Sequence, residues 1–118
     1  MAFAEKFEDL KVWQQARELA NMVYDAAEKL RDFDFRSQIQ RASVSVMNNI
    51  AEGFERRTKK DFAHFLDLSK GSAGEVRSML YLAEDRRYIL PDTALTLRSS
   101  YERLSTSIGA LASRLRNP

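Results

Sequence analysis

The 118-residue sequence contains no cysteine, only two prolines and four glycines, and a single histidine. Without cysteine the chain has no disulfide and no thiolate metal site, which fits a reducing compartment. So few glycines and prolines favour long helices over many short strands. No apolar run approaches the roughly 20 residues that a transmembrane helix needs, and the first ten residues lack the order of a signal peptide. We therefore expect a cytoplasmic protein without a membrane segment.

What the chain does contain indicates one folded domain over residues 1–118. Hydrophobic residues make up 44% of the sequence and charged residues 31%, a composition typical of globular rather than disordered chains. The first 35 residues carry five basic and eight acidic side chains, whereas the remainder carries fourteen and nine. A basic portion of this kind can meet nucleic acid or an acidic partner, although most such surfaces are only solvated.

Residues 36–57 show the clearest pattern, with two apolar stripes at helical spacing. The two stripes are separated by about 100° around a helix of 3.6 residues per turn. The first consists of Ile39, Ala42, Ser43, Val46, Ile50 and Gly53, and the second of Val44, Met47, Ala51 and Phe54. Because one stripe suffices for a helix at the edge of a monomeric bundle, two stripes predict a helix covered from two sides.

The apolar period predicts four helices, at about 10–31, 36–57, 59–87 and 92–115, joined by short turns. Four helices of similar length with short connections favour an all-α, antiparallel up-down-up-down bundle. Candidate start signals for these helices are Asp9, Asp34, Thr58 and Asp92. Gly71 and Gly74 lie inside the third helix, where we expect the close approach of another backbone to compensate for their cost.

The first three helices carry more apolar surface than one bundle can bury, and exposed patches of this kind are uncommon on monomers. We therefore expect a homo-oligomer. The predicted interface consists of the apolar residues outside the main stripes of the second and third helices: Val44, Met47, Ala51, Phe54, Phe65, Leu68, Met79 and Leu82.

Four polar residues accompany these stripes: Asn49, Glu52, Ser72 and Glu75. One interpretation is that Asn49 is a helix-interior amide satisfied by a neighbour and that Glu52 is a solvated charge. The other is a buried polar group that fixes the register between helices, as single polar residues do in coiled coils. The sequence leaves both interpretations open, and neither is catalytic.

Four cations cluster between the second and third predicted helices: Arg56, Arg57, Lys59 and Lys60. They fit a solvated turn near a helix end, where positive charge is favoured. They also fit a patch for RNA or DNA phosphates, repeated on each subunit of an oligomer so that several weak contacts act together.

The chain has no phosphate-binding glycine loop, zinc-binding HExxH motif or cysteine nucleophile. We therefore expect a protein that is not an enzyme and uses no metal or cofactor. The alternative rests on His64 and on Arg57, seven residues before it. An Arg-x6-His pattern in a helical bundle resembles that of HEPN ribonucleases, which are metal-independent, with the arginine holding a phosphate and the histidine moving a proton.

Three segments resemble one bacterial family: FEDLKVWQQA, QIQRASVSVMNNIAEGFER and DFAHFLDLSKGSAGEV. It comprises four-helix-bundle proteins encoded in intervening sequences of 23S ribosomal RNA genes, and includes the accessory variability determinant of diversity-generating retroelements. The most specific matches are Asn49 to Gly53 and the group Gly71, Ser72 and Glu75. The chain departs from the family pattern at Arg87, where a glycine is expected.

This resemblance implies a ring-like homo-oligomer, with five subunits the best match, and a non-enzymatic scaffold of unassigned cellular role. For the retroelement relatives it implies a surface that binds nucleic acid and a protein partner, a reverse transcriptase. An adaptor for nucleic acid or for protein is therefore one function that the sequence admits.

Overall fold

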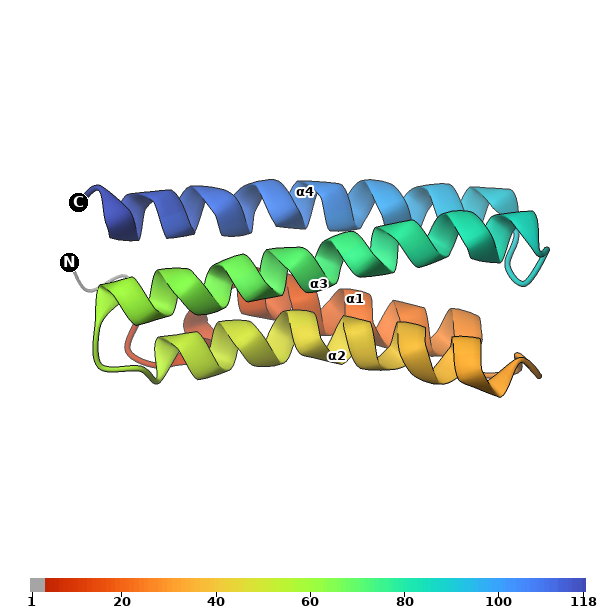
Figure 1. The fold of residues 1–118 in the computed structure, drawn as a ribbon, viewed down its shortest axis with the longest axis horizontal. Coiled ribbons are helices and arrows are strands. Elements are labelled where there is room, and N and C mark those ends of the chain that lie inside the picture. The colour runs from red at the N-terminus through yellow and green to blue at the C-terminus, as the bar shows by residue number, and fades with distance from the viewer. Residues whose placement is uncertain (1–3) are drawn as a thin grey trace.

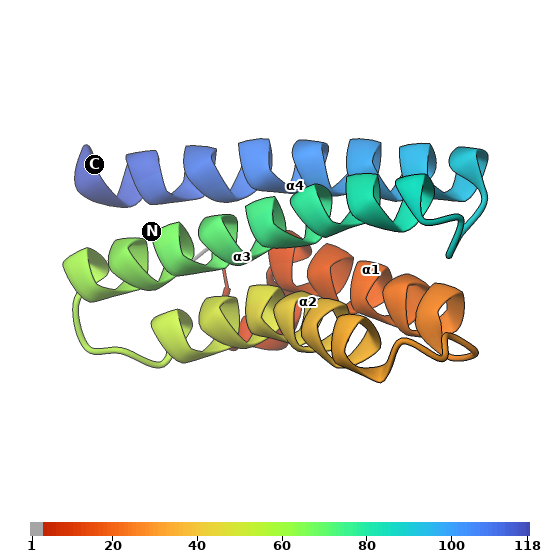
Figure 2. The ribbon, with the colours of Figure 1, turned by 45° about the vertical axis from the view of Figure 1, so that its right-hand side comes forward.

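The computed structural model describes residues 4–118, which form four α-helices and one short 3-10 helix but no strand. Their bounds are η1 (Phe7–Asp9), α1 (Lys11–Ala27), α2 (Phe33–Phe54), α3 (Lys59–Asp85) and α4 (Pro91–Arg116). The α-helices run antiparallel to their neighbours in a bundle measuring 45 × 20 × 19 Å (Figure 1). The α2–α3 connection and the end of α4 lie at one end, and the α1–α2 and α3–α4 connections at the other (Figure 2). The predicted all-α fold of four helices is confirmed.

The core follows the predicted stripes. In α2 the buried residues are Phe35 and all six members of the first stripe. In α4 the buried residues include Leu97, Tyr101, Leu104, Ile108 and Leu111, which recur at four- and three-residue steps. α3 packs extensively against both α2 and α4, whereas α1 meets α4 less extensively. The periodic apolar pattern therefore determines which face of each helix points inward.

Several helix ends differ from the predicted ones. α1 ends at Ala27 rather than near residue 31, and its N-cap is Leu10, since Asp9 belongs to η1. α2 begins at Phe33 because Asp32, not Asp34, accepts the hydrogen bond from the N–H of Phe35 at 3.1 Å. Asp32 also accepts a hydrogen bond from the Tyr88 hydroxyl at 2.7 Å. These two hydrogen bonds hold the pKa of Asp32 below its usual value, and they tie the α1–α2 connection to the α3–α4 connection.

The start of α3 is as predicted: Thr58 is its N-cap and accepts a hydrogen bond from the N–H of Asp61 at 3.1 Å. The start of α4 differs from the prediction. Its N-cap is Leu90, and Pro91 is already helical. Proline is favoured at a first helical position because its missing N–H would have no partner there, and Asp92 then favours the positive end of the helix.

The expected close backbone approach occurs at a different glycine. Gly71 and Gly74 have no neighbouring atom within 4 Å of the position that a Cβ would take, so that prediction is wrong within the single chain. At Gly53 a Cβ would lie 2.6 Å from the Cβ of Phe65 and 3.2 Å from the carbonyl oxygen of Phe62. Gly53 therefore sets the distance between α2 and α3 at the end of the bundle that carries their connection.

Among residues 4–118, Arg87 is the non-glycine residue with a positive φ, at 60°; the family resemblance predicts glycine at this position. The N–H of Arg87 bonds the carbonyl of Glu84 at 3.0 Å, and the N–H of Tyr88 bonds that of Ala83 at 2.8 Å. This pair of bonds is the Schellman pattern that ends many helices, with a left-handed residue that is usually glycine.

Replacing Arg87 by glycine should therefore stabilise the protein, because a side chain in the left-handed region costs about 1 kcal/mol that glycine avoids. We expect the free energy of unfolding in urea to rise by about 0.5–1 kcal/mol. The matched control is Arg86→Gly one residue earlier, where φ is −81°; this variant should not gain stability. A loss of stability in Arg87→Gly would contradict the assignment.

Candidate functional site: two apolar patches and a basic turn

None of the eight residues predicted to form an oligomer interface is fully buried in the single chain. Leu68 and Leu82 are 44% and 49% exposed. The other six are half-buried: Val44, Met47, Ala51, Phe54, Phe65 and Met79. The bundle therefore leaves part of each of these side chains in contact with solvent, as the excess of apolar positions predicts.

The interface residues of α3 lie on the side of that helix that faces α2. Ser72 marks this flank, since its hydroxyl lies 2.8 Å from the hydroxyl of Ser45 on α2. At 100° per residue, the four predicted interface residues of α3 lie from this flank outward to the solvent face, together with Gly71 and Glu75. We call this surface the α2–α3 patch; its apolar members are Phe65, Leu68, Met79 and Leu82.

Of the interface residues of α2, Met47 and Phe54 lie on the flank away from Ser45, and Val44 and Ala51 lie on the solvent face beside it. The Phe54 ring also packs against Phe62 of α3, with 5.8 Å between the ring centroids. Ser45 faces α3, and Met47 follows it by two residues, so the two side chains point about 160° apart around α2.

On α1, Gln15, Glu18 and Met22 line a hollow shared with α4, which places Tyr24 on the flank toward α2. Tyr24 is 42% exposed. We call this second surface the α1–α2 patch; its members are Tyr24, Val44, Met47, Ala51 and Phe54.

Three of the polar residues along α2 and α3 form a half-buried cluster. The side-chain nitrogen of Asn49 donates to the carbonyl and to the hydroxyl of Ser45, at 2.9 and 3.0 Å, and Ser45 is bonded to Ser72. Asn49 and Ser72 were expected from the sequence, whereas Ser45 was missed because it lies between the two apolar stripes. The cluster links α2 to α3 within one chain.

Glu52 and Glu75 lie outside this cluster. Glu52 forms an ion pair with Arg56 at 3.1 Å and is half-exposed. Glu75 is exposed and has no hydrogen-bond or ion-pair partner within residues 4–118. The structure therefore leaves both carboxylates unburied in the single chain, and a register role for either one would require a second chain.

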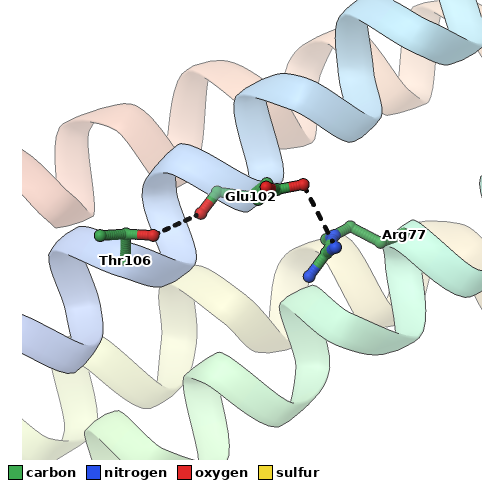
Figure 3. A network of polar contacts seen from close by, with 3 residues as sticks. All are labelled: Arg77, Glu102 and Thr106. Atoms are coloured by element: carbon green, nitrogen blue, oxygen red, sulfur yellow. Dashed lines mark hydrogen bonds and ion pairs between the residues drawn. The ribbon is translucent and has the colours of Figure 1, made fainter.

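The face formed by α3 and α4 differs from both patches because ion pairs cross it. Arg77 pairs with Glu102 at 3.4 Å, and the backbone carbonyl of Glu102 accepts a hydrogen bond from Thr106 (Figure 3). Further pairs join Arg98 to Glu84 and Arg116 to Asp67; the Arg116 hydrogen bond holds the pKa of Asp67 below its usual value. These charges are therefore paired within one chain.

The predicted basic turn is exposed at the end of the bundle where α2 connects to α3. Arg56 is engaged by Glu52 and lies over the Phe65 ring, 4.6 Å from its centroid. Arg57, Lys59 and Lys60 have no acidic partner in the described part of the chain. Lys59 and Lys60 open α3, where the helix dipole disfavours positive charge. Favourable helix electrostatics therefore explains the arginines but not the two lysines.

The two residues of the ribonuclease alternative lie in different parts of the chain. Arg57 lies in the turn and His64 on the solvent-facing side of α3, where its ring packs against Phe65. Among the described residues no hydrogen bond or ion pair joins them. A general acid or base must reach the proton that it moves, together with the group that holds the phosphate. Nothing in this geometry favours the ribonuclease hypothesis.

The remaining surface features do not coincide with the predicted site residues. A hollow of about 630 Å³ lies at the end opposite the basic turn, lined by Ala26, Tyr88, Ile89 and Leu90 among others, and contains none of the predicted site residues. Over residues 4–118, no three acidic or histidine side chains gather as metal ligands do. In the same residues, every helix is too short or too polar to cross a bilayer.

Comparison with known proteins agrees with this fold. The family model described as 23S rRNA-intervening sequence protein matches residues 8–110. A crystal structure of a protein with unknown function from the S23 ribosomal protein family of Bacteroides thetaiotaomicron superimposes with a TM-score of 0.81. The superposition covers 86% of this chain and 97% of that one at 19% identity, a level that shows the fold alone. No curated protein matches the chain.

Proposed function

The chain belongs to the 23S rRNA-intervening sequence protein family, and from that premise and its surface we propose that it is a non-enzymatic, homo-oligomeric scaffold. The observation that carries the proposal is the pair of apolar patches, the α2–α3 patch and the α1–α2 patch. Contiguous exposed apolar side chains on a folded domain are typical of a surface that contacts another chain. The kinship with the accessory variability determinant, the cytoplasmic location and a protein partner stay predictions.

The placement of the patches favours a head-to-tail assembly. A two-fold dimer uses one self-complementary surface on both subunits, whereas two different surfaces on one chain allow each copy to bind the next. Such contacts form a ring when the rotation between copies closes. We therefore propose that the α2–α3 patch of one copy covers the α1–α2 patch of its neighbour, with five copies the number that the family resemblance implies.

The α3–α4 face supports this arrangement by contrast. Its charged side chains pair within the chain, so burying it would require many charges to lose water for no new partner. The outer wall of the ring would then be α3 and α4. Light scattering during gel filtration tests the proposal: it predicts three or more copies of the 13.6 kDa chain, and a single copy at micromolar concentration would refute it.

Nucleic acid is a second candidate, as a partner of the scaffold, and the unpaired Lys59 and Lys60 at the start of α3 support it. In a ring of copies related by rotation, each subunit would present its basic turn at the same end. Several weak phosphate contacts would then act together through a high effective concentration.

Replacing Arg56, Arg57, Lys59 and Lys60 with alanine should abolish retention of RNA and DNA by the assembled protein. The affinity of the wild type should fall steeply between about 50 and 200 mM salt. The slope of log affinity against log salt concentration should be roughly proportional to the number of phosphate contacts. The matched control carries alanine at four exposed cations of the opposite end: Lys29, Arg31, Arg86 and Arg87. If both variants bind equally well in filter retention, the basic turn is not the contact.

A further inference from the structure

The α2–α3 patch contains one charge that the single chain leaves without a partner. Glu75 is exposed, follows Gly71 by one helical turn, and has no cation bonded to it within residues 4–118. Gly71 has no atom within 4 Å of its Cβ position, so the helix surface beside Glu75 is open. On α2, the cation closest to Glu75 in height along the bundle is Arg41. Its Nε donates instead to the carbonyl of Ser37 at 3.4 Å.

The flank of α1 beside the α1–α2 patch carries an unpaired positive charge. Arg17 lies on the same flank of α1 as Tyr24, which follows it by seven residues, or about two turns. Its guanidinium carbon lies 5.6 Å from the centroid of the Trp13 ring. No acidic side chain bonds it within the described residues. An arginine resting on an aromatic ring is partly ordered before any partner arrives, so less conformational entropy is lost on pairing.

Arg17 and Glu75 also lie at nearly the same height along the bundle. α1 and α2 run antiparallel from Ala27 and Phe33, so Arg17, ten residues from that end, is level with Ser43. The bond between Ser45 and Ser72 then places Ser43 level with Gly74, because α2 and α3 are also antiparallel. Glu75 is thus displaced from Arg17 by about one residue, a rise of about 1.5 Å.

Rotation about an axis parallel to the bundles keeps equal heights equal. In a ring of this kind the unpaired carboxylate of one copy therefore faces the unpaired guanidinium of the next. We propose that Glu75 of each copy forms an inter-subunit ion pair with Arg17 of its neighbour and so fixes which way, and at what height, the two patches meet. This inference rests on the proposed function, whose partner and register it specifies.

Charge exchange tests the pair. Glu75→Arg and Arg17→Glu each place like charges opposite one another at every interface, which should raise the subunit concentration at half-dissociation at least about 30-fold. The double variant Glu75→Arg, Arg17→Glu restores opposite charges and should assemble like the wild type. Dilution followed by light scattering measures each value, and circular dichroism confirms that each helical fold is intact.

Arg103→Glu is the matched control, since Arg103 is exposed, forms no ion pair within residues 4–118 and lies on α4 outside both patches, so its reversal should leave assembly unchanged. If the wild type assembles and neither single exchange weakens it, or if the double variant fails to recover, this ion pair is wrong while the scaffold proposal stands. If the wild type is itself a single chain, the scaffold proposal fails instead.

Discussion

Alanine at Gly53 is expected to lower the free energy of unfolding by about 2 kcal/mol, the largest stability loss that we predict for a single methyl group. The new Cβ would lie 2.6 Å from the Cβ of Phe65, an atom fixed to the α3 backbone, and 3.2 Å from the Phe62 carbonyl oxygen. Neither neighbour can move without separating α2 from α3. Overpacking of this kind costs about 1–3 kcal/mol or more, which exceeds the helix-propensity gain of up to about 1 kcal/mol from replacing glycine by alanine.

The measurement is urea unfolding at one fixed, low subunit concentration, because association would otherwise contribute to apparent stability. Gly74→Ala is the matched control: Gly74 is also inside a helix but has open space at its Cβ position. That variant should gain about 0.5–1 kcal/mol. Equal stability changes in the two variants would mean that α2 and α3 do not approach as described.

Glutamate at Leu68 should convert the assembly into single chains. Leu68 is 44% exposed within the α2–α3 patch, so in one chain the new carboxylate stays solvated and the fold keeps its stability. In the assembly the same carboxylate would be buried without a cation, a cost of several kcal/mol repeated at every interface. Light scattering should report a mass near 13.6 kDa for this variant.

Leu95→Glu is the control for this result. Leu95 is 55% exposed, but it lies on α4, outside both patches, so its variant should keep the wild-type mass. Assembly that survives Leu68→Glu, or that is lost equally in Leu95→Glu, would show that the α2–α3 patch is not the contact surface.

The helical periodicity accounts for most of what could be predicted. The first stripe of α2, from Ile39 to Gly53, is buried without exception, because burial on one side of a helix requires apolar residues at three- and four-residue steps. Thr58 was identifiable for a similarly local reason, since a cap and its partner are three residues apart. Features determined by contacts within one or two helical turns can therefore be predicted from the sequence.

Features that depend on the distance between helices were not predictable. Gly53, Gly71 and Gly74 are all glycines in helices, yet only Gly53 meets a neighbouring helix. The sequence predicted Asp34 as the cap of α2, whereas Asp32 supplies it and also accepts a hydrogen bond from Tyr88, 56 residues beyond. The cluster of Ser45 with Asn49 and Ser72 likewise forms only when α2 and α3 pack. Tertiary packing decides among residues that local rules treat alike.

The cysteine-free chain allows the central claim, head-to-tail contact between two different patches, to be tested by cross-linking. Ala51 and Leu68 lie in the two patches at nearly equal heights, so Ala51→Cys and Leu68→Cys in one chain would place thiols on both sides of each contact. With a short bis-maleimide, we predict that the double variant gives covalent species of three or more subunits, while neither single variant links copies. A covalent dimer from either single variant, or no linkage in the double variant, would contradict the account.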